Sequence, residues 1–221
     1  MPIKFPPVHS ATPEGLLAVG GKIDTETLKS AYTQGIFPWP ISKNSPLTWF
    51  SPDPRGILEL KDFHISRSFN RFLRKNPYTI KFNHNFEEVI RNCAVVKRKH
   101  EKGTWISQDI ITGYNELFNQ GLSYCVAVYH EKRLVGGLYG VCMGELISGE
   151  SMFHKETNAS KLAFYALVHQ LESKGIRWID TQMVTPVIKS FGGTEISRTN
   201  FIKKLQALNF EHPQRSQLFG S

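Results

Sequence analysis

From about residue 63 onward, apolar residues recur with the periods of helices and strands. The clearest helix is predicted over residues 159–175, where one face collects Ala159, Leu162, Ala163, Ala166, Leu167 and Leu171. Similar spacing and helix-capping residues predict four shorter helices, over residues 66–76, 85–96, 107–121 and 198–208.

Strands are predicted over five stretches: 78–83, 123–130, 133–143, 145–153 and 177–183. The tight Gly144–Glu145 step predicts a hairpin between the third and fourth of these. This order favours an α+β domain, residues 63–221, around a central mixed, largely antiparallel sheet. An antiparallel meander followed by a helix and a strand is also the layout of GNAT-like acyltransferase domains, which is an analogy of topology.

Residues 1–62 lack this regular apolar pattern and are rich in Pro, Gly and aromatic residues, as in "GIFPWP" and "PLTWFSPDPRG". One helix is predicted there, over residues 25–34, with Asp24 as its N-cap and Gly35 at its end. The remainder should form turns and short extended pieces. We therefore expect a small irregular N-terminal domain over residues 1–62.

Composition narrows the class of protein. The 221 residues are 40% hydrophobic, which is enough for a substantial core. No apolar run reaches the roughly 18 residues that a membrane span needs, and no secretory leader is visible. The three cysteines lack paired spacing and the eight histidines lack ligand spacing. We expect a cytoplasmic protein without a membrane segment or a metal site.

The formal net charge is +8, which favours a polyanionic partner such as nucleic acid. Trp39 and Trp105 lie beside turns or loops, and Trp105 follows the basic run Lys97, Arg98 and Lys99. Aromatic faces can stack on unpaired bases while the cations contact phosphates. Ordinary packing of the tryptophans and a solvated basic loop are the alternative interpretation.

Two predicted strands carry acidic residues in otherwise apolar surroundings. In "RWIDTQM", strand alternation places Asp180 and Gln182 on one face, although Asp is depleted in strands. In "LISGESMF", alternation places Glu150 on one face with Ser148 and Met152. A single acid could be a solvated strand residue. Two acids indicate a cleft for a cation or a catalytic site, because burying an unpaired charge costs several kcal/mol.

Motifs for several other chemistries are missing from the sequence. It contains no P-loop, no G-x-S-x-G elbow, no Cys/His signature and no dinucleotide-binding glycine pattern. An enzyme of this kind would need no metal, ATP, cofactor or side-chain nucleophile. Its substrate should therefore arrive already activated.

Ten short motifs, in order along nearly the whole chain, resemble the leucyl/phenylalanyl-tRNA–protein transferases. They are "EGLLAVGG", "AYTQGIFPW", "WFSPDPRG", "FHISRS", "GTWIS", "LVGGLYGV", "SGESMF", "NASK", "IDTQ" and "EISRTNF". The resemblance implies transfer of Leu or Phe from aminoacyl-tRNA to an N-terminal Arg or Lys of an acceptor protein, marking it for degradation. It also implies a small N-terminal domain, a GNAT-like C-terminal domain, no metal and a cytoplasmic setting. We expect a monomer without a cofactor.

The resemblance also implies site residues. The catalytic group would be Asp180, Gln182 and Glu150, and the tRNA 3′-adenosine would lie on Trp39 and Trp105. An apolar pocket for the Leu or Phe side chain would be lined by Leu138, Ile147, Met152, Phe164, Leu167 and Ile179. We expect Lys97, Arg98 and Lys99 to contact the tRNA backbone. The chain departs from the family pattern at Thr181, usually Cys, and near Val187, commonly His.

An aminoacyl ester is an activated donor, so amide formation needs no further fuel. A carboxylate beside the acceptor ammonium raises the amine's pKa, which opposes simple deprotonation. We therefore expect Asp180 to orient the amine and balance the positive charge that develops on attack. Gln182 would act by hydrogen bonding. Glu150 would meet the acceptor's cationic side chain or handle a second proton.

Two alternatives stay open from the sequence. An acyltransferase that uses acyl-CoA should carry a pyrophosphate-binding glycine loop, which "SGESMFHKETNASK" lacks. A non-catalytic RNA-binding module would explain the charge and the tryptophans but would leave the acid–amide pair unexplained.

Overall fold

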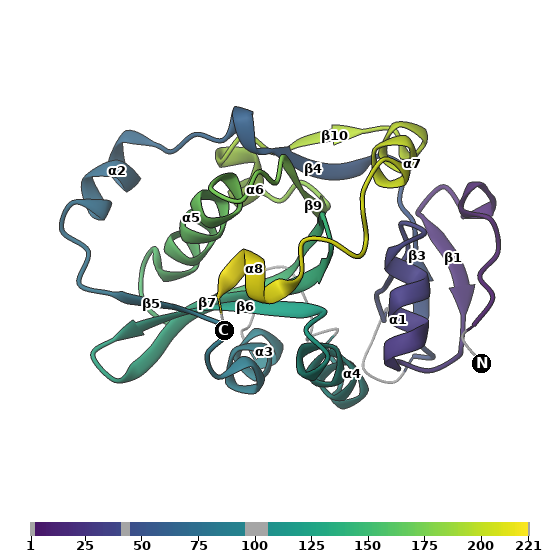
Figure 1. Cartoon of the computed structure of the whole chain (residues 1–221), viewed down its shortest axis with the longest axis horizontal. Helices are drawn as coiled ribbons and strands as arrows, with labels where there is room; N and C mark the ends of the chain where they lie inside the picture. The colour runs from purple at the N-terminus through teal and green to yellow at the C-terminus, as the bar shows by residue number, and fades with distance from the viewer. Residues whose placement is uncertain (1–2, 41–44, 96–105, 221) are drawn as a thin grey trace.

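A computed structural model gives the fold and describes residues 3–40, 45–95 and 106–220. Its main sheet has seven strands in the order β10-β4-β9-β8-β7-β6-β5 (Figure 1). Neighbouring strands are antiparallel except for β8 and β9, which run parallel. The strands are β4 (Arg55–Glu59), β5 (Thr79–Phe82), β6 (Ser123–His130), β7 (Arg133–Met143), β8 (Leu146–His154), β9 (Trp178–Gln182) and β10 (Thr194–Ile196).

Helices cover both faces of this sheet (Figure 1). One face packs against α3 (Phe86–Val95) and α4 (Gln108–Asn119), and the other packs against α5 (Ala159–Glu172). The other helices are α1 (Thr25–Tyr32), α2 (Arg67–Leu73), α6 (Pro186–Ser190), α7 (Arg198–Gln206) and α8 (Arg215–Phe219). The predicted mixed α+β architecture with a mostly antiparallel sheet is confirmed. Across the described ranges, none of the helices has the length and apolarity to cross a membrane.

The N-terminal segment is more ordered than its composition indicated. It forms a second sheet, in the order β1-β3-β2, from Leu16–Val19, Thr48–Phe50 and Phe37–Pro38. Helix α1 begins after Asp24, whose side chain accepts the Thr27 N–H as predicted for an N-cap. Residues 55–59 were assigned to this segment without a predicted sheet strand, yet they form β4, an inner strand of the main sheet. The division into domains at residue 62 stays a prediction.

Two β-bulges interrupt neighbouring strands of the main sheet. Between β7 and β8, Tyr139 pairs with Ser151 and Gly140 with Gly149, so Glu150 is the extra residue. Between β4 and β9, Ile57 pairs with Asp180 and Gly56 with Gln182, so Thr181 is the extra residue. Bulges bend a strand and redirect its side chains, and they are common next to active sites.

The bulge in β8 changes which side chains share a face. Ile147 and Met152 are five positions apart, so strict alternation would place them on opposite faces. Both pack in the cluster under α5. The alternation that grouped Glu150 with Ser148 and Met152 therefore does not continue through the strand.

Candidate active site

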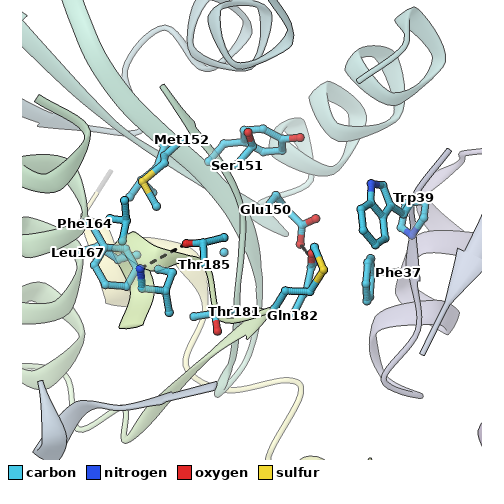
Figure 2. A pocket seen from close by; sticks show the side chains of 17 residues that line it. Phe37, Trp39, Glu150, Ser151, Met152, Phe164, Leu167, Thr181, Gln182 and Thr185 are labelled. Atoms are coloured by element: carbon cyan, nitrogen blue, oxygen red, sulfur yellow. Dashed lines mark hydrogen bonds between the residues drawn. The ribbon is translucent and has the colours of Figure 1, made fainter. Parts of the chain in front are cut away.

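A pocket of about 260 Å³ opens where β8 and β9 meet α5, α6 and the segment after α1 (Figure 2). Its apolar floor includes four residues that the sequence predicted, Leu138, Met152, Phe164 and Leu167. Figure 2 shows Phe37 and Trp39 on one side of Glu150 and Gln182, with Met152, Phe164 and Leu167 on the other. The pocket thus combines an apolar floor, an acid–amide wall and an aromatic rim.

The parallel pairing of β8 with β9 brings the acid and the amide together. Ser148 is opposite Asp180 in the register, so Glu150 and Gln182 each follow two residues later on adjacent strands. The Gln182 Nε2 amide donates to Glu150 Oε1 at 2.9 Å, and Ser148 Oγ donates to the same oxygen at 2.7 Å. Glu150 and Gln182 both line the pocket, one at the bulge of β8 and the other next to the bulge of β9.

A buried tyrosine pair supports Glu150 from behind. Tyr114 Oη donates to Glu150 Oε2 at 3.3 Å, and the Tyr114 and Tyr32 hydroxyls are hydrogen-bonded to each other. Burial raises the pKa of both tyrosines well above their ordinary value, so the hydroxyls stay protonated. Glu150 is therefore held at both oxygens while it lines the pocket.

Burial raises the pKa of Glu150 above the ordinary 4.5. Hydrogen bonds from Ser148 and Gln182 oppose this effect, and the negative charge of Asp180 adds to it. The net direction is upward because burial is the largest contribution. Glu150 is thus a stronger base when ionised than a solvated glutamate.

Asp180 has a different environment from the one expected of it. The residue is 1% exposed and does not line the pocket. Arg55 Nε donates to Oδ1 at 2.9 Å and Arg55 Nη2 donates to Oδ2 at 2.6 Å. The Gln182 backbone N–H also donates to Oδ1, at 2.9 Å. The Asp180 carboxylate thus faces Arg55 and not the site where an amine would bind.

The other predicted site residues divide into three groups. Trp39 lines the pocket and packs edge-on against Phe50. Ile147 and Ile179 do not line it; they are 1% and 0% exposed, buried in the same core cluster under α5 that contains the floor residue Leu138. Trp105, Lys97, Arg98 and Lys99 lie outside the described residues.

Sequence reasoning missed several residues around the pocket. Phe37 forms part of the rim, and the wall around Gln182 is lined by Thr181, Met183, Thr185 and Ile188. The Thr181 hydroxyl has no hydrogen-bond partner within the described part of the chain. Phe37 belongs to the family motif "GIFPW", from which Trp39 was assigned to the site, so the sequence could have indicated Phe37 as well. No sequence feature indicated the residues after Gln182, since their placement depends on the bulge in β9.

The donor set of the pocket does not suit a metal ion. Among the described residues that line it, Glu150 is the single acidic side chain, beside the Gln182 amide, hydroxyls and apolar groups. In the described ranges no three His, Cys, Asp or Glu side chains gather to hold a metal ion. The arrangement instead fits an acyl group on the floor and a cationic or amine group beside Glu150.

Comparisons with known proteins identify the same family as the ten sequence motifs. Residues 57–206 match the family model described as leucyl/phenylalanyl-tRNA protein transferase, and residues 21–53 match the model for the N-terminal domain of that transferase. A leucyl/phenylalanyl-tRNA–protein transferase of Pseudoalteromonas atlantica is 46% identical over 97% of this chain and 91% of its own length. The same-named protein of Flavobacterium johnsoniae is 44% identical over 92% of this chain and 95% of its own.

Likeness to a solved structure is weaker. The structure of L-PGS from Bacillus licheniformis shares 18% identity at a TM-score of 0.42, over 73% of this chain and 52% of that one. The extent of the family-model match and the identity to full-length relatives decide the assignment. The chain belongs to the leucyl/phenylalanyl-tRNA–protein transferase family.

Proposed function

We propose that this enzyme transfers Leu or Phe from aminoacyl-tRNA to the N-terminal Arg or Lys of acceptor proteins, marking them for degradation. The observation that carries the proposal is a single pocket with an apolar floor, the Glu150–Gln182 pair and the Phe37–Trp39 rim. Family membership supports the donor and the class of reaction. The acceptor rule and its role in degradation are the parts that need testing.

The donor would enter with its amino-acid side chain on the floor formed by Leu138, Met152, Phe164 and Leu167. At about 260 Å³ the pocket lies just below the range of ~300–1,000 Å³ found for ligand sites, so it suits an aminoacyl group better than a whole nucleoside. The 3′-adenosine would then lie at the mouth, where Trp39 offers a stacking face. Trp105 would be its second contact.

The reaction forms a C–N bond between the acceptor amine and the ester carbonyl carbon and breaks the ester C–O bond. The nitrogen becomes cationic on attack, and the ribose oxygen leaves with a proton. Glu150 lies where it can balance the positive nitrogen and accept its proton, and its raised pKa favours that transfer. Gln182 cannot titrate at neutral pH and would hold Glu150 in position.

An N-terminal Arg or Lys brings positive charge on both its α-ammonium and its side chain. Glu150, an acidic group on the pocket wall, would attract this charge and bring the amine to the ester. Proximity of the two reactants supplies much of the rate enhancement in such condensations. Acceptors with an acidic first residue would be repelled for the same reason.

The wider organisation is proposed on the same basis. A GNAT-like catalytic domain over residues 63–221 would follow a small N-terminal domain, and the enzyme would work as a cytoplasmic monomer without a cofactor. The net charge of +8 supports tRNA binding, with Lys97, Arg98 and Lys99 on the tRNA backbone.

The decisive assay measures transfer of labelled Leu or Phe from charged tRNA to peptides that begin with Arg or Lys. Matched controls are the same peptide with an acetylated α-amine and one that begins with Glu. Product with Arg and Lys alone supports the proposal. Transfer from an acyl-CoA in place of aminoacyl-tRNA, or tRNA binding without transfer, would overturn it in favour of one of the two alternatives.

A further inference from the structure

The motif "WFSPDPRG" ends in Arg55 and Gly56, which pack directly against the acid–amide strand. Arg55 is 1% exposed and reaches Asp180 across 125 residues of sequence. Two parallel N–H···O bonds, at 2.9 and 2.6 Å, join its guanidinium to the carboxylate. This fork geometry fixes both planes relative to each other, which a lysine ammonium could not do.

The remaining faces of Arg55 are also occupied. Its Nη1 donates to the Gly35 carbonyl at 3.0 Å, just beyond α1. Its guanidinium carbon lies 4.7 Å from the ring centre of Phe37 and 4.4 Å from that of Phe201. Arg55 therefore joins the rim residue Phe37 to β9, and a buried ion pair in which each of the three guanidinium nitrogens donates a hydrogen bond holds one geometry.

Gln182 has a backbone conformation that needs such support. Its φ is +60°, in the left-handed region that non-glycine residues rarely adopt. The Gln182 N–H is bound by Asp180 Oδ1, the oxygen that also receives Arg55 Nε. Asp180 thus transmits the position of Arg55 to the backbone of Gln182.

Gly56 accommodates the other side of the same bend. It pairs with Gln182 across the bulge, and a Cβ at Gly56 would come within 2.6–2.9 Å of the Met183 backbone. The chain after Gln182 passes through the space that a side chain would fill. Arg55 and Gly56 together therefore shape the bulge that points the Gln182 amide at Glu150.

We infer that Arg55 is a positioning residue that acts through Asp180 to aim Gln182 at Glu150, with Gly56 providing the room. The inference rests on the transfer reaction proposed above. It makes Asp180 a positioning residue as well. The reacting amine then meets Glu150 and Gln182, the two polar groups of this cluster that line the pocket.

A double-mutant cycle tests the inference by kinetics. Arg55→Lys keeps the charge and loses the fork, and it should lower kcat between about tenfold and 100-fold with the KM for each substrate nearly unchanged. In a Gln182→Ala background the same change should lower kcat less than about twofold, because the aimed group is already gone. Arg215→Lys is the matched control, since Arg215 also covers a phenylalanine ring and donates to backbone carbonyls.

Equal losses from Arg55→Lys in both backgrounds would overturn the inference and leave Arg55 with a purely structural role. Should that variant not fold, Gly56→Ala removes no charge and enters the same cycle. A second readout needs no turnover. The Gln182 side-chain amide signal, assigned by its loss in Gln182→Ala, should move in Arg55→Lys to the position of a solvent-exposed amide and stay in place in Arg215→Lys.

An unmoved amide signal in folded Arg55→Lys would equally contradict the inference. Absence of transfer by the wild-type enzyme, with the amide signal shifted as expected, would instead count against the proposed function and leave the positioning role intact.

Discussion

At the scale of residues, the two acids of the site have opposite environments. Asp180 is enclosed and neutralised by Arg55, whereas Glu150 lines the pocket and receives hydrogen bonds from Tyr114, Ser148 and Gln182, which are neutral donors. Burial is the largest contribution to the pKa shift of Glu150 and sets its upward direction. Glu150 is therefore the acid of the pair that lines the pocket and whose pKa burial raises.

Replacing Glu150 with Gln should lower kcat by about 10²-fold or more, because the charge that balances the attacking nitrogen is lost. Wild-type activity should fall on acidification through the Glu150 pKa, which lies above 4.5. The variant should lack this acid limb. Measurement of kcat against pH for both proteins checks the assignment, and an acid limb that survives in the variant would show that another group titrates.

The same substitution should stabilise the fold. A carboxyl whose pKa is raised in the folded state opposes folding once ionised, at pH values above its folded pKa, and this penalty disappears as the pH falls toward 4.5. Glu150→Gln should therefore raise the free energy of unfolding at neutral pH, by an amount that solvent screening keeps small because Glu150 is partly exposed. Denaturant unfolding at several pH values should show the gain shrinking on acidification; a constant difference would contradict it.

At the scale of elements, both active strands depend on bulges. The bulge in β8 exposes Glu150, and the bulge in β9 turns Gln182 toward it. Each bulge has a glycine on the facing strand, Gly140 on β7 and Gly56 on β4. The absence of a side chain at these positions allows the bulged strand to approach closely.

Gly140→Ala should disturb the β8 bulge. Its Cβ would lie 2.0 Å from the Ser148 carbonyl oxygen, so the strand must shift, and we expect a loss of about 1–3 kcal/mol in the free energy of unfolding. Gly149 pairs with Gly140, yet its nearest neighbour to an added Cβ is 4.0 Å away. Gly149→Ala is the matched control and should stay within about 1 kcal/mol of wild type by denaturant unfolding. Equal losses would refute the steric argument.

At the scale of the whole molecule, the pocket is assembled from parts far apart in the chain. The segment after α1, the β7–β8 hairpin, α5 and β9 each contribute one wall (Figures 1 and 2). The charge is also a property of the whole, with 27 basic and 19 acidic residues. A tRNA bound at the pocket mouth would release counterions over a surface larger than the pocket.

Changing Lys97, Arg98 and Lys99 to Glu should weaken tRNA binding and flatten its dependence on salt, because phosphate contacts set the slope of affinity against salt concentration. A control with the exposed residues Lys61, Lys132 and Lys174 changed to Glu alters the net charge equally. Binding titrations over a range of salt concentrations compare the two proteins. Identical slopes would remove the basic run from the tRNA footprint.

Local patterns predicted much of the fold. The helix expected over residues 159–175 is α5, Ala159–Glu172, and the hairpin at Gly144–Glu145 joins β7 to β8. Strand β4 was not predicted from the sequence because its apolar run is short and lies among prolines and glycines. The bulges were not predicted because the register of a strand depends on its partner strand.

The site was only partly predictable for the same reason. Glu150 and Gln182 stood out as polar residues in apolar strands, and the pocket brings them together. Ile147 and Ile179, which the resemblance assigned to the pocket, lie in the same cluster as its floor but do not line it, because the depth of burial within a cluster depends on three-dimensional packing. The partner of Asp180 could not be inferred, since Arg55 lies 125 positions away in a segment that seemed irregular.

The floor of the pocket and its reactive wall come from different elements. Phe164 and Leu167 lie one turn apart on α5, while Glu150 and Gln182 belong to the bulged strands. Substitutions in α5 can enlarge or fill the floor without entering the hydrogen-bond network around Glu150. Natural selection or protein engineering could therefore change which amino acid is transferred while the Glu150–Gln182 pair stays unaltered.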